Sequence, residues 1–77
     1  MELYYYEECE YSQTILYTIY KLKIQDEFEL KDIHRHPHYA DELEELTGSR
    51  IVPCLVNNDV PLTEAKVIRK YILSEFQ

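Results

Sequence analysis

The sequence predicts an α/β domain in which helices pack on a mixed four-stranded sheet, in the order β-α-β-α-β-β-α. Residues 2–6 form a short, aromatic-rich segment that is typical of a strand. One apolar stripe at helical spacing follows, formed by Ile15, Leu16, Ile19 and Leu22. Residues 28–33 then alternate apolar and polar side chains, as a strand does. A strand, a helix and a second strand in this order predict a βαβ unit with a right-handed crossover.

The middle of the chain predicts a loop and a second helix. Residues 34–38 form the loop, in which Pro37 can lie at or near the start of a helix. Within residues 39–47, Ala40, Leu43 and Leu46 fall on one side and acidic residues take the other. Gly48 is expected to end this helix, because glycine readily adopts the left-handed conformation that follows a helix C-terminus.

The last third of the chain predicts an antiparallel hairpin and a third helix. Residues 51–56 form the most hydrophobic run and indicate a buried strand, with Pro53 at its start or at an irregularity. A turn at residues 57–59 leads to a short return strand at residues 60–62. Thr63 is the expected N-cap of the last helix. The inward-facing residues of that helix are expected to be Val67, Ile68, Tyr71 and Ile72.

Size, charge and cysteine count restrict the class of protein. The chain has 77 residues and a formal net charge of −7, so we expect one domain, residues 1–77, that binds neither nucleic acid nor an anionic membrane. No segment has the pattern of a signal peptide or a membrane span. The 2 cysteines are too few for a secreted disulfide scaffold. We therefore expect a cytoplasmic protein, and we expect it to be a monomer.

Cys9 is the candidate for chemistry, because it follows a predicted strand and directly precedes a predicted helix. Backbone N–H groups and the dipole at a helix N-terminus stabilise a thiolate, which is the nucleophile in disulfide exchange. The flanking Glu8 and Glu10 indicate an exposed loop. The alternative interpretation is that Cys9 is a small apolar residue of the core.

Three segments in order along the chain resemble one group of proteins. Residues 9–12, Cys-Glu-Tyr-Ser, resemble the Cys-Pro-Tyr-Cys active-site segment of glutaredoxins, which can also end in Ser. Residues 51–53, Ile-Val-Pro, resemble the Thr-Val-Pro of that family, where the proline follows a cis peptide bond. Residues 62–65, Leu-Thr-Glu-Ala, with Ile68 and Tyr71 beyond them, resemble the end of a glutathione S-transferase N-terminal domain. The resemblance implies a thioredoxin-like, glutaredoxin-like fold over nearly the whole chain.

The resemblance also implies a function and the residues that perform it. The function is monothiol thiol–disulfide oxidoreduction on glutathione mixed disulfides, with Cys9 as nucleophile, glutathione as co-substrate, and glutathionylated or disulfide-bonded proteins as partners. Tyr11 would shape the cleft, and Ser12 would either donate a hydrogen bond to the thiolate or cap the helix. The residues implied to hold glutathione are Val52, Pro53, Glu64 and Ala65. An extended tripeptide can pair with backbone groups as an added strand, and a helix N-terminus suits a carboxylate.

Arg50 precedes the proline segment and is the cation expected to face the ligand. Its planar guanidinium could bind a glutathione carboxylate. The alternative interpretation is a solvated loop arginine, and the sequence leaves both open.

Several positions depart from the resemblance. Ser12 replaces the second cysteine, so Cys9 cannot close a disulfide across one helical turn and a monothiol cycle remains. Tyr6 replaces a lysine that binds a glutathione carboxylate in many glutaredoxins, and Ala65 replaces a serine. Acidic residues surround the thiol, where they should disfavour the thiolate and repel an anionic ligand. The runner-up hypothesis is therefore a catalytically degenerate binding module.

The sequence raises three further chemical possibilities, at the histidines of residues 34–38, at residues 9–12 and at Cys54. His34, His36 and His38 alternate, but Pro37 interrupts regular structure there and no fourth ligand is evident, so no metal site is expected. Iron–sulfur carriage, as in glutaredoxins with Cys-Gly-Phe-Ser, is not expected, because Glu10 stands in place of the glycine. Cys54 is expected mainly as a core residue of the third strand, with a role as resolving partner of Cys9 as the alternative.

Overall fold

The computed structural model describes residues 1–77 as four strands, three α-helices and one short 3₁₀ helix. The elements in chain order are β1 (Glu2–Tyr5), α1 (Glu10–Lys21), η1 (Gln25–Glu27), β2 (Glu29–Asp32), α2 (His38–Thr47), β3 (Cys54–Asn57), β4 (Val60–Leu62) and α3 (Ala65–Phe76). The predicted order of strands and helices is confirmed. The 3₁₀ helix before β2 was not predicted.

The four strands form one sheet in the order β2-β1-β3-β4. β1 and β2 are parallel, with Leu3 opposite Leu30, and α1 provides the crossover between them. β3 runs antiparallel to β1, with Leu55 opposite Leu3, and β4 runs antiparallel to β3. The predicted βαβ unit and the C-terminal hairpin are therefore both present in one mixed sheet.

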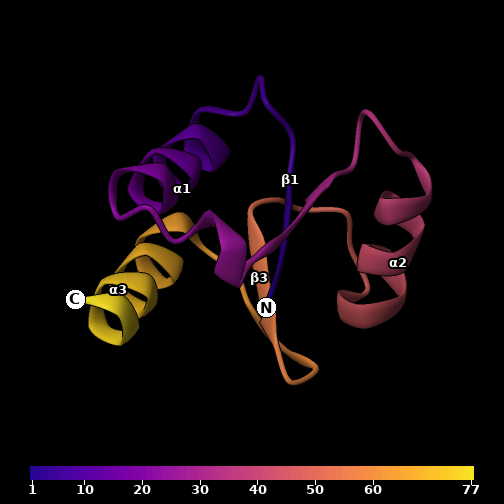
Figure 1. The fold of residues 1–77 in the computed structure, drawn as a ribbon. Helices are drawn as coiled ribbons and strands as arrows, with labels where there is room; N and C mark the ends of the chain where they lie inside the picture. The colour runs from indigo at the N-terminus through magenta and orange to yellow at the C-terminus, as the bar shows by residue number, and fades with distance from the viewer.

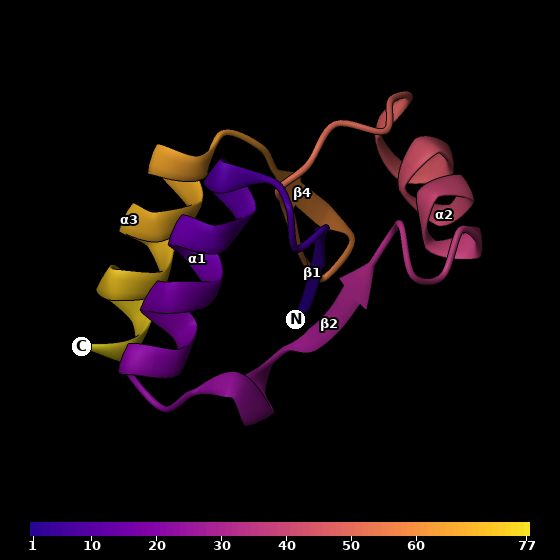
Figure 2. The same ribbon diagram turned by 90° about the horizontal axis from the view of Figure 1, so that it is seen from above.

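Helices cover both faces of the sheet. α1 and α3 lie side by side on one face, and α2 lies on the other (Figures 1 and 2). Successive side chains of a strand point to opposite faces, so each central strand serves two cores. The core under α1 and α3 contains Leu3, Ile15, Ile19, Phe28, Leu55, Ile68 and Ile72. The core under α2 contains Tyr4, Ile33, Ala40, Leu43, Cys54 and Val56.

Helix α1 begins earlier than the sequence indicated. Glu10 was expected in an exposed loop, but Glu10 and Tyr11 already lie in the first turn and Cys9 is the N-cap. The reason is that the Cys9 side chain accepts the free N–H of Ser12 and so completes the helix start without a serine or aspartate. Helix α2 similarly begins at His38, and Gly48 ends it with φ +82°, as predicted.

The hairpin and α3 differ from the prediction at three points. β3 begins only at Cys54, because Pro53 has no N–H to contribute to the ladder. Glu64, rather than Thr63, occupies the N-cap of α3. Val67 was predicted to face inward but is 44% exposed, whereas Ile68 and Ile72 are fully buried. The buried face of α3 is therefore narrower than the pattern of apolar residues predicted.

Candidate functional site

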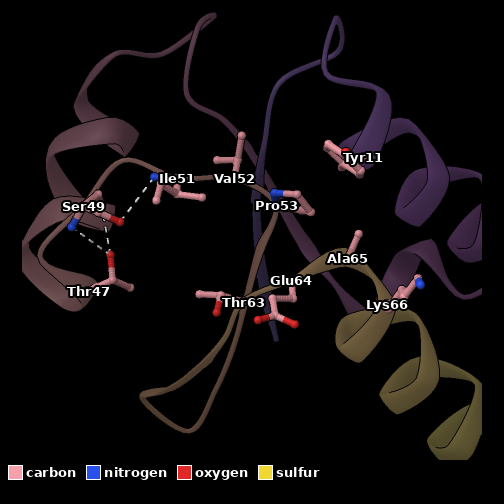
Figure 3. A pocket seen from close by; sticks show the side chains of 10 residues that line it. All are labelled: Tyr11, Thr47, Ser49, Ile51, Val52, Pro53, Thr63, Glu64, Ala65 and Lys66. Atoms are coloured by element: carbon pink, nitrogen blue, oxygen red, sulfur yellow. Dashed lines mark hydrogen bonds between the residues drawn. The ribbon is translucent and has the colours of Figure 1, made fainter.

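A cavity of about 640 Å³ opens between the start of α1, the α2–β3 loop and the start of α3. Figure 3 shows the side chains that surround it. These are Tyr11, Thr47, Ser49, Ile51, Val52, Pro53, Thr63, Glu64, Ala65 and Lys66. The segments that the resemblance singled out therefore meet at one hollow, although they are far apart in the sequence.

Cys9 is held at the N-terminus of α1, beside this cavity but not in its lining. Its Sγ accepts the backbone N–H of Ser12 at 3.5 Å, and its own carbonyl accepts the N–H of Gln13 at 2.9 Å. Gln13 also donates from its side chain to the carbonyl of Glu7 at 2.8 Å, which ties the loop before Cys9 to the helix. The thiol is partly exposed. The thiol therefore lies at the positive end of the helix dipole, between the exposed side chains of Glu8 and Glu10.

Tyr11 connects the thiol-bearing helix to the cavity. It lies two residues after Cys9 in the first turn of α1, and its side chain is 69% exposed at the cavity wall. An exposed aromatic ring at this position can cover a bound ligand. The predicted role of Tyr11 in shaping a cleft is consistent with this placement and remains a prediction.

The backbone at Val52 is available to a ligand. The Val52–Pro53 peptide bond is cis, as the resemblance implied. The N–H and C=O groups of Val52 form no hydrogen bond within the protein. A free donor and acceptor on one extended residue can pair with a peptide as an added strand does.

The α2–β3 loop is folded by its own short hydrogen bonds. The hydroxyl of Thr47 donates to the carbonyl of Ser49 at 3.0 Å and accepts the N–H of Ser49 at 3.2 Å. The N–H of Ile51 in turn reaches the hydroxyl of Ser49 at 3.4 Å (Figure 3). These bonds leave the Ile51 side chain 67% exposed at the cavity. Sequence reasoning missed Thr47 and Ser49 because they carry no motif.

Glu64 has an unusual backbone at the start of α3. Its φ is +69° and its ψ is 119°, in a region that a residue with a Cβ rarely adopts. No side chain caps this helix, so the first N–H groups of α3, from Ala65 onward, are open toward the cavity. Strained backbone of this kind is often found at ligand sites. Lys66, which sequence reasoning missed, adds the one cation of the cavity lining.

Arg50 lies outside the lining, although its two neighbours in sequence are part of it. Its Nη2 is 2.6 Å from Oδ1 of Asp41 and 3.2 Å from Oε1 of Glu44, and its Nε is 3.3 Å from the same Glu44 oxygen. Hydrogen bonds from the guanidinium to Glu44 and Asp41 raise the pKa of Arg50 above its usual value. The predicted ligand cation is thus already bound to two carboxylates of α2.

The two other polar candidates near the thiol are buried. Ser12 is fully buried, and its hydroxyl has no hydrogen-bond partner. Cys54 is also fully buried in the core under α2, which confirms its expected core position, and burial raises the pKa of its thiol. Its burial gives no support to the alternative of a resolving partner for Cys9.

The three histidines do not converge. His34 stacks on the Tyr6 ring at 4.0 Å and lies 3.6 Å from a Glu8 oxygen. His36 and His38 contact Tyr39 instead. No group of three or more His, Cys, Asp or Glu side chains has the arrangement of a metal site.

A polar network that the sequence did not reveal lies on the opposite face, under α2. Lys31 is nearly buried, and its Nζ contacts Oε1 of Glu42 at 2.8 Å and the hydroxyl of Tyr4 at 3.4 Å. Burial would lower the pKa of Lys31, but these hydrogen bonds outweigh it and the pKa is raised. Burial, with the hydrogen bond to Glu42, raises the pKa of Tyr4 to about 12. The network joins α2 to the sheet.

The structure brings together five of the eight residues predicted for the site. Tyr11, Val52, Pro53, Glu64 and Ala65 all line the cavity. Cys9 and Ser12 lie at the start of the adjoining helix, and Arg50 is turned toward α2. The cavity can therefore offer free backbone groups, a carboxylate and a cation to a peptide-like ligand next to a thiol.

Residues 3–77 match the glutathione S-transferase N-terminal domain family. The chain belongs to this family. Three solved structures illustrate how widely its fold is shared. Human glutathione S-transferase T1-1 in its apo form superposes with a TM-score of 0.81 at 25% identity, over 97% of this chain and 31% of that one. No curated protein matches the chain in sequence.

Two insect structures give the same result for the fold. An epsilon-class glutathione S-transferase from the housefly Musca domestica has a TM-score of 0.77 at 21% identity, over 97% of this chain and 34% of that one. A diazinon-metabolizing glutathione S-transferase from the silkworm Bombyx mori has a TM-score of 0.77 at 19% identity, over 99% and 37%. This glutathione S-transferase N-terminal domain thus spans about a third of the length of these structures.

The comparisons and the topology together establish a thioredoxin-like fold related to glutathione-using proteins. The helices of the domain are all too short or too polar to cross a membrane.

Proposed function

We propose that this domain is a glutathione-dependent monothiol oxidoreductase that acts on mixed disulfides through Cys9. The observation that carries the proposal is the position of Cys9, whose Sγ accepts the N–H of Ser12 at the N-terminus of α1. A thiolate formed there gains a hydrogen bond and the favourable end of the helix dipole. Membership of a glutathione-related family supports glutathione as co-substrate.

The proposed reaction consists of two balanced exchanges. The Cys9 thiolate attacks the glutathione sulfur of a mixed disulfide, a Cys9–glutathione disulfide forms, and the substrate leaves as a thiolate that takes up a proton. A second glutathione thiolate then attacks the glutathione sulfur, oxidised glutathione departs, and Cys9 returns to its thiol or thiolate form. Ser12 offers no second sulfur, so the cycle depends on free glutathione.

The cavity supports a binding mode for the tripeptide. The free N–H and C=O groups of Val52 would pair with the peptide backbone beside Pro53. The open amides at Ala65 suit the carboxylate of the γ-glutamyl end, and Glu64 suits its amine. Tyr11 would cover the ligand. Both cysteines are free thiols, which supports the further proposal of a cytoplasmic protein. We also propose that it is a monomer.

The acidic surroundings of Cys9 favour a second candidate function. Glu8 and Glu10 are exposed on either side of the thiol, and Glu10 lies in the first turn of α1. Their charge opposes both the thiolate and an anionic ligand. In this alternative the domain binds a partner or ligand without turnover, and Cys9 does not exchange.

Mass spectrometry of the protein after incubation with oxidised glutathione tests the proposal. We expect one glutathione adduct per chain, absent in Cys9→Ser and retained in Cys54→Ser, followed by Cys9-dependent reduction of a glutathionylated peptide. No adduct on a folded protein would reject the oxidoreductase. The absence of an adduct would also favour the binding module, in which Cys9 does not exchange, whereas an adduct without turnover would reject catalysis by a reactive Cys9.

A further inference from the structure

The contact between Arg50 and helix α2 changes the role expected for this residue. Ser49 and Ile51 line the cavity on either side of Arg50 in sequence, yet the guanidinium is turned toward α2 (Figure 3 shows the two neighbours). There Asp41 and Glu44, one turn apart on the helix, hold it through three hydrogen bonds of 2.6–3.3 Å. A ligand carboxylate in the cavity would have to compete with these two carboxylates.

We propose that Asp41 and Glu44 are specificity-determining residues that compete with a ligand carboxylate for Arg50. The inference rests on the proposed function, in which glutathione occupies the cavity. In the free protein, the Arg50 guanidinium is bonded to Asp41 and Glu44 of α2. When a ligand places a carboxylate near the α2–β3 loop, the guanidinium exchanges one carboxylate partner for another.

The exposure of the three side chains makes this exchange feasible. The side chains of Arg50, Asp41 and Glu44 are 51%, 71% and 53% exposed, so water screens each pair. Ion pairs at this exposure stabilise a protein only weakly, and a flexible arginine can leave them at little cost. Because two carboxylates of α2 compete with a single ligand carboxylate, the Arg50 guanidinium still favours its contacts with Asp41 and Glu44. Asp41 and Glu44 therefore lower the affinity for a carboxylate ligand without blocking the cavity.

Lys31 and Lys66 are poorly placed for this role. Lys31 lies under α2 on the opposite face, nearly buried against Glu42 and Tyr4. Lys66 lines the cavity at the start of α3, at the opposite end from Ser49 and Ile51, the sequence neighbours of Arg50 (Figure 3). Recognition of a carboxylate at the α2 end of the cavity thus depends on Arg50.

Calorimetric titration with two ligands tests the inference. The ligands are S-methylglutathione, which cannot exchange with Cys9, and its glycyl ethyl ester, which lacks one carboxylate. For Asp41→Asn/Glu44→Gln we expect the Kd of S-methylglutathione to fall about two- to tenfold, in keeping with the weak pairs removed. The Kd of the ester should stay unchanged. The gain should vanish when Arg50→Ala is added.

A matched variant separates this effect from a general loss of negative charge. Glu45→Gln/Asp59→Asn also removes two acids, one of them on α2, but neither contacts Arg50. An equal gain in this control would overturn the inference. Weaker or unchanged binding of both ligands in Asp41→Asn/Glu44→Gln would also overturn it and would make Arg50 a support of the loop. If no variant binds either ligand, the proposed function fails and the inference fails with it.

Discussion

The backbone N–H of Ser12 donates to Sγ of Cys9 at 3.5 Å, while the hydroxyl of the same serine is fully buried without a partner. A buried, unpaired hydroxyl destabilises a protein by about 1–3 kcal/mol. Because the N–H of residue 12 survives any substitution except proline, Ser12→Ala keeps the contact to the thiol. We expect Ser12→Ala to raise the free energy of unfolding by about 1 kcal/mol in urea titrations.

The exposed Ser74 on α3 provides the control, since Ser74→Ala changes the same atoms without relieving a buried hydroxyl. Its effect on unfolding should stay within about 0.5 kcal/mol. A clear loss of stability in Ser12→Ala would show that the buried hydroxyl has a hydrogen-bond partner.

The two cysteines should differ sharply in reactivity. Cys9 is partly exposed at a helix N-terminus, whereas Cys54 is fully buried and its thiol pKa is raised by that burial. We expect iodoacetamide to add one label per chain to the native protein, at Cys9, and a second label only in denaturant. Peptide mapping by mass spectrometry locates the labels. Native labelling of Cys54 at a comparable rate would mean that the core under α2 opens readily.

The periodicity of apolar residues was sufficient to predict the order of strands and helices. Alternation in residues 28–33 and the stripe of Ile15 and Ile19 depend on local geometry, which the sequence encodes directly. The first residues of the helices were harder to predict, because Cys9 and Glu64 are rare N-cap residues. Only the backbone around them reveals that role.

The site residues that lie in recognisable sequence motifs could be predicted. The segments containing Cys9, Val52 and Glu64 have characteristic spacing, so the resemblance indicated them before their meeting in space was known. Arg50 and Lys31 carry no such signal. The carboxylate that each cation contacts depends on how α2 packs against the loop and the sheet. This tertiary packing cannot be read from the residues next to Arg50 or Lys31 in the sequence.

Glu64 is expected to lower the stability of the domain through its backbone conformation while its carboxylate strengthens ligand binding. Its φ of +69° is costly for a residue with a Cβ, whereas glycine adopts it freely. We expect Glu64→Gly to raise the free energy of unfolding by about 0.5–1 kcal/mol and to weaken S-methylglutathione binding, because the carboxylate is lost. Glu64→Ala should weaken binding equally without the gain in stability. Thermal unfolding and calorimetric titration measure the two effects, and a stability gain in both variants would contradict the backbone explanation.

The Lys31–Glu42 pair should make stability depend on pH on the acid side. The hydrogen bonds from Lys31 and Tyr4 lower the pKa of Glu42 below its usual 4.5, and they outweigh a smaller opposing effect of burial. A carboxyl whose pKa is lowered on folding adds stability above its unfolded pKa and loses it as the pH falls through the folded value. The Glu42 side chain is 41% exposed, so solvent reduces this contribution to about 1 kcal/mol.

Glu42→Gln removes the titrating group but leaves an oxygen that can accept from Lys31. We expect the wild type to exceed this variant in unfolding free energy by about 1 kcal/mol at neutral pH, and the difference to shrink steadily below a pH of about 4.5. Urea titrations across this range measure it. Glu45→Gln, on the same helix and without a bond to Lys31, should show no such trend. A difference that stays constant down to low pH would mean that Glu42 packs against Lys31 without a charge-dependent bond.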